Sequence, residues 1–295
     1  MIITKILGGL GNQMFQYALG RRIAYLNDET LKLDLSGFET YDLHNYSLNH
    51  FNICEDIATK NEIRSFKGSN NRYLEHIIRM MNRNGLYLPY IQKGRPIYER
   101  SIDYDSSILD NTADIYLEGY WQSEKYFKEI EEIIRNDFTI KTPPDPQNVK
   151  TADEIRSTEA ICIHVRRGDY VSNPTTYQSI GLCPLDYYYR AIDYITSKVE
   201  NPHYFVFSND PSWTRQNIQI DAPTTYICNN PPEKNFEDLR LMTLCKHFII
   251  ANSSFSWWGA WLSSNEKKIV IAPAVWFKGI RYNDDDRLPK EWIRL

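Results

Sequence analysis

The stretch AICIHVRRGDY (residues 160–170) joins an unbroken apolar run to two adjacent arginines and a glycine. A short apolar run that ends in this way predicts a buried strand over 160–166, followed by a loop. His164 and Arg166 share a face because side chains alternate along a strand. Arg166 can donate two parallel N–H bonds to phosphate oxygens, and Arg167 adds a second cation. We therefore expect a diphosphate clamp here, the alternative being a surface arginine pair bridged to acids.

Downstream of this stretch, short apolar runs alternate with helical patterns as far as residue 272. The alternation predicts an α/β fold with a parallel, doubly wound sheet, and ligands bind such sheets at the carboxyl ends of the strands. We expect strands at 203–208, 224–228, 248–251 and 268–272, and helices at 185–199, 212–217, 236–247 and 254–263.

Polar residues that follow the expected strands are further candidate ligands. Ser208 and Asp210 end one strand, although Asn-Asp-Pro is also a common turn. Asp238 near the start of a helix can accept two N–H bonds from a guanine, or it is only a favourable charge in the first helical turn. A strand-to-helix turn suits a β-phosphate, because hydroxyls and helix N–H groups meet there. The residues of that turn are Asn252, Ser253, Ser254 and Phe255.

The chain opens with an apolar segment, a glycine turn GGLGNQ (8–13), a helical pattern over 13–26 and a strand-like run at 31–35. Glycines between a strand and a helix let backbone N–H groups approach a ligand closely. Gly11 and Gln13 are therefore candidate binding residues. The turn overlaps the dinucleotide fingerprint GxGxxG, but Met14 occupies the third glycine position. An NAD enzyme and a purely structural turn are the alternatives.

Residues 141–146 (KTPPDP) contain three prolines in four positions, which cannot continue a helix and predict a linker. We expect a domain boundary there, with one domain over 1–145 and a second over 146–295, whose last segment is free to pack back on the first. Helices are expected before it at 71–83 and 123–138, the latter with Ser123 as its N-cap.

The 295 residues have a formal net charge of −4, which does not indicate a nucleic-acid partner. Five scattered cysteines contain no CxxC pair and are expected as reduced thiols in a cytoplasmic protein. No apolar run reaches the roughly 18 residues that a membrane span needs. Neither zinc-type His/Cys spacing nor a GxxxxGK[ST] loop is present, so we expect no metal site and no P-loop.

Five motifs in order closely resemble glycosyltransferase family 11, the α-1,2-fucosyltransferases. They are GGLGNQMFQYALG (8–20), GYWQSEKYF (119–127), HVRRGDY (164–170), FSND (207–210) and ANSSFSWWGAWL (251–262). The resemblance implies a GT-B-type architecture of two facing Rossmann-like domains, an acceptor-side N-terminal one and a GDP-sugar-binding C-terminal one. It also implies inverting transfer of L-fucose from the donor substrate GDP-fucose to the 2-hydroxyl of a β-galactoside, without a metal or another cofactor.

Residue roles follow from the same resemblance. It assigns His164, Arg166 and Arg167 to the diphosphate and nucleotide, the serine-rich turn to Ser253 and Ser254, and the guanine-reading acid to Asp238. Asn209 departs from the pattern, because two consecutive acids are often seen at that place.

For the chemistry, fixed cations can neutralise a departing diphosphate without a metal, and we expect Arg166 in that catalytic role. Asp169 either takes the acceptor proton or braces the arginines, and Asn12 orients the acceptor. The alternatives are an inverting transferase with another nucleotide sugar and a non-catalytic nucleotide- or sugar-binding protein. A cytoplasmic bacterial enzyme of this type is expected to act on O-antigen or capsule precursors, with peripheral association to the membrane that carries them.

Overall fold

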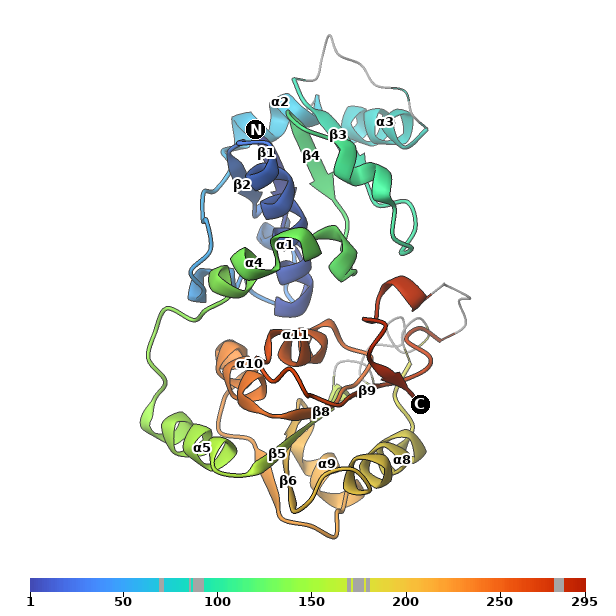
Figure 1. Cartoon of the computed structure of the whole chain (residues 1–295). Helices are drawn as coiled ribbons and strands as arrows, with labels where there is room; N and C mark the ends of the chain where they lie inside the picture. Colours follow the sequence, from blue (N-terminus) through green and yellow to red (C-terminus); the bar gives the residue numbers. More distant parts are fainter. Residues whose placement is uncertain are drawn as a thin grey trace. The chain divides into compact units, whose positions relative to one another are not determined.

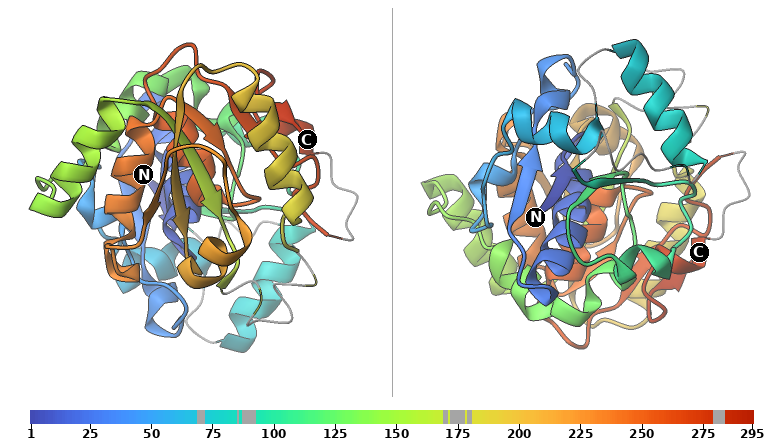
Figure 2. Two further views of the ribbon diagram at one scale, coloured as in Figure 1. Left: turned by 90° about the horizontal axis from the view of Figure 1, so that it is seen from below. Right: turned by 90° about the horizontal axis from the view of Figure 1, so that it is seen from above.

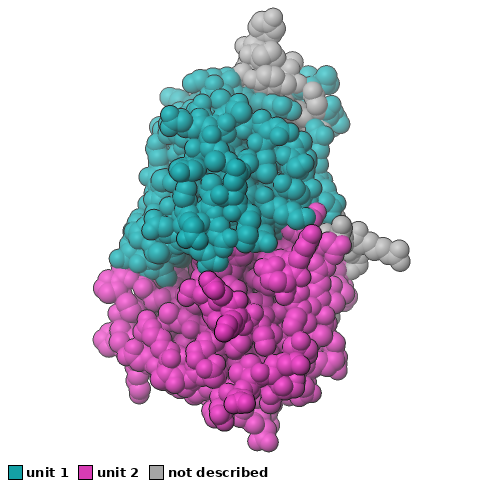
Figure 3. Space-filling model, in the orientation of Figure 1, with its two compact units in different colours: residues 1–141 teal, residues 142–295 magenta. Residues whose placement is uncertain are grey.

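The computed structural model describes residues 1–68, 72–84, 86, 93–168, 171, 178, 181–278 and 284–295. The chain divides into two compact units, Met1–Lys141 and Thr142–Leu295, which Figure 3 colours separately. Each unit contains its own parallel β-sheet. Within the described ranges, no helix is both long and apolar enough to cross a membrane.

The first unit is built on four parallel strands in the order β2-β1-β4-β3. β1 and β4 lie side by side at the centre of this sheet. Ligands bind parallel sheets of this kind at the carboxyl ends of the strands. The strands are β1 (Ile2–Lys5), β2 (Leu31–Asp34), β3 (Arg95–Tyr98) and β4 (Ile115–Glu118). The helices are α1 (Leu10–Leu26), α2 (Lys60–Lys67), α3 (Arg72–Arg83) and α4 (Glu131–Asp137).

Helix α1 begins three residues before the expected start at Gln13. Gly9 is its N-cap, and the Gly9 carbonyl accepts bonds from the amides of Asn12 and Gln13 at 2.9 and 3.1 Å. Gly8 has a φ of +88°, which favours glycine, and a Cβ there would lie 3.0 Å from Asn12 Nδ2. Asn12 and Gln13 therefore belong to the first helical turn and not to the loop.

The predicted continuous helix over 123–138 is wrong. Two short 3₁₀ segments, Glu124–Tyr126 and Lys128–Ile130, precede α4. Ser123 caps the first of them, but the backbone of Phe127 (φ −142°, ψ 5°) leaves the helical region between the two. The apolar spacing that suggested one helix is met equally by three short pieces, because each still buries its apolar side chains.

The second unit has six parallel strands in the order β10-β9-β8-β5-β6-β7, which is the dinucleotide-fold order 3-2-1-4-5-6 read from the other side. Figures 1 and 2 show α5, α10 and α11 on one face of this sheet and α8 and α9 on the other. The predicted parallel, doubly wound sheet is thus confirmed. The strands are β5 (Glu159–Val165), β6 (Pro202–Ser208), β7 (Thr224–Ile227), β8 (His247–Ile249), β9 (Val270–Ala272) and β10 (Ile293–Arg294). The helices are α5 (Pro146–Arg156), α8 (Leu185–Thr196), α9 (Pro211–Asn217), α10 (Asn235–Leu244) and α11 (Ser254–Leu262).

The central strand β5 is buried on both faces, which explains its unbroken apolar run. Ile161 and Ile163 belong to a core cluster with the α8 side chains Tyr187 and Tyr188. His164 points to the opposite face, where its ring lies 5.7 Å from that of Phe255 on α11. The switch point of this sheet lies between β5 and β8.

Candidate functional site

Three groups of predicted donor residues follow neighbouring strands of the second sheet at one edge, whereas Asp238 lies in helix α10 and Gly11 and Gln13 lie in the first unit. Val165, the last residue of β5, pairs with Ser208 of β6, and Ile163 pairs with Ile249 of β8. The segments 166–168, 209–210 and 250–253 therefore leave the sheet side by side, at the carboxyl ends of the strands. Arg166 is half-buried at this edge.

Asn209 holds the arginine segment in place, a role that the sequence did not reveal. Its Oδ1 atom accepts bonds from the backbone amides of Arg167 and Gly168, at 2.9 and 3.1 Å. A Cβ on Gly168 would lie 3.0 Å from Asn209 Nδ2 and 3.1 Å from the Asn209 carbonyl oxygen. The close approach explains the glycine after the two arginines. Asn209 belongs to the FSND motif that the sequence singled out. Its hydrogen-bond partners, the amides of Arg167 and Gly168, become evident only once the strand ends are brought together in the fold.

Three predicted ligands interact with one another and with α9. Arg167 Nε lies 3.5 Å from Asp210 Oδ2, and its guanidinium carbon lies 4.2 Å from the centre of the Trp213 ring. Asp210 also caps α9, accepting a bond from the Trp213 amide at 3.2 Å. Ser208 Oγ accepts bonds from the Asp210 amide and from Thr214 Oγ1, both at 2.9 Å. These contacts fix the direction of Arg167.

His164 is a buried, neutral imidazole. Only 3% of it is exposed, and burial together with the charge of Arg166 lowers its pKa to about 3. Within the described part of the chain, its Nδ1 atom has no hydrogen-bond partner. His164 therefore suits a neutral polar contact and not a second positive charge beside a phosphate.

The start of α11 provides N–H donors at the same edge. Ser253 is the N-cap of this helix, yet its hydroxyl makes no capping bond to the helix amides. The Ser253 carbonyl accepts a bond from the Trp257 amide at 3.1 Å, which opens the helix. Ser254 follows as the first helical residue. A helix N-terminus next to a half-buried arginine has the chemistry of an anion site.

Asn252 braces the surrounding loops. Its side chain is 3% exposed, and Nδ2 donates to the carbonyls of Gly181 and Trp276 at 3.3 and 3.1 Å. Cys183 Sγ lies 3.4 Å from its Oδ1 atom. The amide thus connects three segments that are distant in sequence.

Gln13 has a similar bracing position in the first unit. It is completely buried, and its Nε2 atom donates to the carbonyls of Gly8 and Asn45, both at 2.8 Å. Its Oε1 atom accepts from the Ser47 amide at 2.9 Å. Gly11 is buried in the first turn of α1. The side chain of Gln13 therefore connects the glycine turn to the segment at Asn45 and Ser47 and supports the turn through these hydrogen bonds.

Asp238 lies in the first turn of α10 and is half-buried. Burial, and then the neighbouring Glu237, raise its pKa to about 6, although a hydrogen bond from Asn230 acts in the opposite direction. Asn230 Nδ2 donates to Asp238 Oδ1 at 2.7 Å and exchanges two further bonds with the buried amide of Asn148. The carboxylate is therefore held in a fixed direction, and its charge is poorly solvated.

The corresponding edge of the first sheet has a polar cluster of its own. Asn12 Oδ1 accepts a bond from Gln122 Nε2 at 2.7 Å. Glu99 accepts the amides of Tyr120 and Trp121 at 2.7 and 2.9 Å, which fixes the turn after β4. Sequence reasoning missed Gln122 and Glu99, although Gln122 lies in the quoted motif at 119–127.

Asp169, the expected proton acceptor, lies outside the described residues. Among those that are described, no group of three His, Cys, Asp or Glu side chains is arranged to hold a metal ion.

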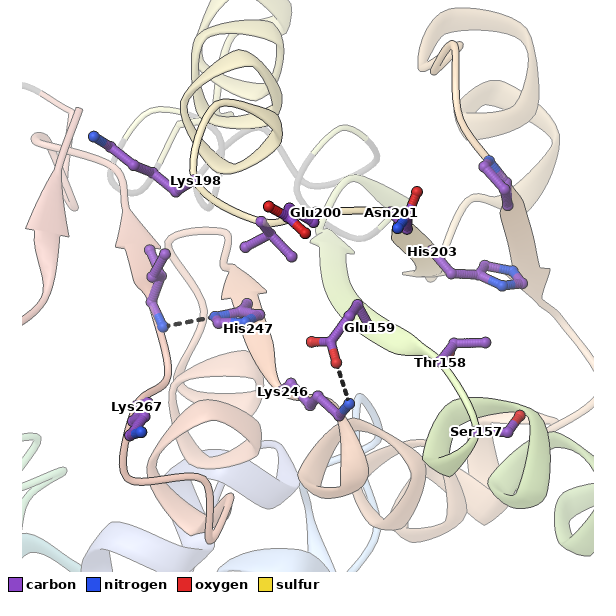
Figure 4. A pocket seen from close by; sticks show the side chains of 13 residues that line it. Ser157, Thr158, Glu159, Lys198, Glu200, Asn201, His203, Lys246, His247 and Lys267 are labelled. Atoms are coloured by element: carbon purple, nitrogen blue, oxygen red, sulfur yellow. Dashed lines mark hydrogen bonds and ion pairs between the residues drawn. The ribbon is translucent and has the colours of Figure 1, made fainter.

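A hollow of about 850 Å³ lies at the opposite, amino edge of the second sheet (Figure 4). Its lining includes Glu159, which pairs with Lys246 at 2.5 Å, and His247, whose Nδ1 accepts the Ile269 amide at 3.0 Å. None of the predicted site residues lines it. The hollow is thus separate from the edge where the arginines and the serine turn meet.

Comparison with known proteins places this geometry in a family. The family model described as glycosyl transferase family 11 matches residues 1–295. The chain is 35% identical to an α-1,2-colitosyltransferase of Escherichia coli, covering 100% of this chain and 99% of that one. It is 33% identical to the O-antigen biosynthesis glycosyltransferase WbnK of E. coli, with 98% of each chain covered. Human galactoside α-(1,2)-fucosyltransferase 1 is 27% identical over 51% of this chain and 43% of its own.

Among solved structures, NodZ α-1,6-fucosyltransferase crystallised with GDP matches with a TM-score of 0.52 at 13% identity, covering 88% of this chain and 91% of that one. A mutant of Arabidopsis thaliana FUT1 in complex with GDP matches with a TM-score of 0.50 at 13% identity, over 92% and 70% of the two chains. These neighbours have the GT-B fold, so the predicted fold class is confirmed. With a match along its entire length, the chain belongs to glycosyl transferase family 11.

Proposed function

We propose that this glycosyltransferase transfers L-fucose from GDP-β-L-fucose to the 2-hydroxyl of a galactose-containing acceptor, with inversion at the anomeric carbon. One observation carries the proposal: Arg166 and the start of α11 lie at the switch point of a sheet with the dinucleotide-fold strand order. Family membership and the α-1,2-linked products named for the relatives support the linkage.

Each donor contact has a chemical reason. Arg166 and the α11 amides bind the diphosphate, because a fixed cation and a helix N-terminus both attract anions. The Ser253 hydroxyl, which does not cap its own helix, adds a donor. Asp238 reads the guanine, since its carboxylate is held in direction by Asn230. Arg167 acts mainly by bracing the loop through Asp210.

The transfer step breaks the bond between C1 of the sugar and the β-phosphate oxygen while the acceptor oxygen bonds to C1 from the opposite face. The electron pair of the broken bond goes to GDP, so a cation placed at the diphosphate lowers the barrier. The acceptor proton goes to Asp169 or to the departing phosphate. Asn12, oriented by Gln122, positions the acceptor hydroxyl.

The proposal also covers the roles of the two units, the location of the enzyme and its acceptor. The second unit binds the donor, and the first unit binds the acceptor. The enzyme is cytoplasmic and requires no metal, and its acceptor is a precursor of a cell-surface glycan, as the name of the O-antigen relative suggests.

A second donor is favoured by one observation. A relative that matches the whole chain at 35% identity is named as a colitosyltransferase. A nucleotide-activated colitose is therefore the alternative donor for the same α-1,2 transfer.

The test supplies GDP-fucose, activated colitose and a UDP-sugar with a panel of β-galactosides, with and without EDTA, and determines the product linkage. Arg166→Ala should reduce turnover by about a hundredfold or more, the range seen when one charge-stabilising group is removed. Arg190→Ala is the matched control, because Arg190 pairs with the exposed Asp186 on its own helix α8. Wild-type turnover in Arg166→Ala would refute the mechanism, and transfer from colitose alone would correct the donor.

A further inference from the structure

Helix α3 in the first unit has a strongly exposed apolar face. Tyr73, Leu74, Ile77 and Met80 are 74%, 49%, 38% and 54% exposed. Their spacing places them on adjoining positions of one helical face, which we call the outer face of α3. Leu86, just beyond the helix, is 59% exposed. Core packing does not account for so much exposed apolar surface on one short helix.

The helix is held to its unit by its other side. Ile78 is buried, with 7% of its surface exposed. Arg79 forms an ion pair with Glu118 of β4 at 2.9 Å, and its guanidinium lies 5.2 Å from the centre of the Tyr98 ring on β3. Figure 1 shows α3 beside β3. These contacts present the outer face of α3 on a fixed support.

Positive charge is concentrated in the sequence around this helix. Residues 60–95 contain eight Lys or Arg and two Glu, a formal charge of +6, whereas the whole chain has −4. The rest of the chain is thus strongly acidic, and this segment differs from it in sign. Three of the basic residues, Arg72, Arg79 and Arg83, belong to the sequence of α3 itself.

We propose that the outer face of α3 docks on the surface of an anionic lipid membrane, with the helix lying in the plane of the headgroups. An exposed apolar face on a helix rich in arginine is the pattern of interfacial helices. Anionic headgroups attract such basic segments. A second copy of the chain is disfavoured as the occupant, because two segments in which Lys and Arg outnumber Asp and Glu would face each other across the interface.

Docking through α3 would keep the enzyme at the surface where membrane-bound acceptors lie. The inference does not depend on which nucleotide sugar is the donor. A failure of the donor assay would therefore leave it intact, and a failure of membrane docking would leave the proposed transfer intact.

The experiment is co-sedimentation of the full chain with phosphatidylcholine vesicles that contain or lack phosphatidylglycerol. The wild type should bind the anionic vesicles, and added salt should weaken binding. The double variant Ile77→Gln, Met80→Gln should lower the partition coefficient about tenfold or more, since two apolar side chains no longer enter the lipid. Leu43→Gln is the matched control, because Leu43 is 64% exposed in the same unit but outside α3.

A charge variant, Arg72→Gln with Arg83→Gln, should reduce binding to the anionic vesicles and its salt dependence. Each variant is also assayed with a soluble β-galactoside, where unchanged turnover and unchanged thermal unfolding show that the fold is intact. Absence of wild-type binding to anionic vesicles would overturn the proposal. Equal binding by the Ile77/Met80 variant and the wild type would also overturn it. A third contrary outcome is a wild-type dimer that the Ile77/Met80 variant abolishes, while the wild type does not bind vesicles.

Discussion

Asp238 has a carboxyl group that the fold makes costly to ionise. Its pKa is raised to about 6, so it stabilises the fold below its unfolded pKa of 3.8, and that contribution is lost as the pH rises through about 6. Asp238→Asn keeps an acceptor for Asn230 and should raise the unfolding free energy at pH 7 by about 1 kcal/mol. The same variant should lose most GDP affinity.

Thermal unfolding with and without GDP measures both effects of Asp238→Asn. GDP affinity of the wild type should also weaken as the pH falls below about 6, where the carboxylate is protonated. If the variant binds GDP as the wild type does, Asp238 does not contact the guanine.

His164 imposes the opposite pH dependence. Burial and Arg166 lower its pKa from 6.5 to about 3, so its contribution to stability is present above pH 6.5 and is lost as the pH falls toward 3. The wild type should lose up to about 1.4 kcal/mol of unfolding free energy for each pH unit in that range. His164→Phe should flatten this dependence, which unfolding curves between about pH 7 and 4 would reveal. An equally steep slope in the variant would assign the acid sensitivity to other groups.

The segment after β5 depends on an amide supplied by the end of β6. Asn209→Leu removes the acceptor for the amides of Arg167 and Gly168 and should raise the KM for the donor about tenfold, with a stability loss of about 1–3 kcal/mol. Asn209→Asp keeps the acceptor and should restore most of the activity.

Asn265→Leu is the matched control for Asn209. Asn265 also connects backbone groups, accepting the Lys267 amide at 3.1 Å and donating to the Lys246 carbonyl at 2.8 Å. It should lose comparable stability with an unchanged donor KM. Equal KM changes in the two leucine variants would mean that Asn209 acts only on stability.

The elements of the second unit could be predicted because β5 is buried on both faces, and such a strand reads as a continuous apolar run. The break at Phe127 could not be predicted, because one helix and several short 3₁₀ segments can bury apolar side chains of the same spacing equally well. The hydrogen-bond partners of the buried polar side chains were the main part of the site that could not be predicted from the sequence. Gln13 reaches Asn45 and Asn252 reaches Trp276, and no local pattern encodes contacts at such separations.

The two units have separate sheets, and the proposed donor contacts lie in only one of them. GDP alone should therefore slow amide hydrogen exchange in the second unit, above all at 164–168 and 250–256. The glycine turn at 8–13 should exchange as fast as without ligand. Mass spectrometry of peptides after exchange measures this directly, with UDP as the control nucleotide. Protection of 8–13 by GDP, with none at 250–256, would move the donor site to the first unit. In that case Arg166 would lose its proposed place at the diphosphate.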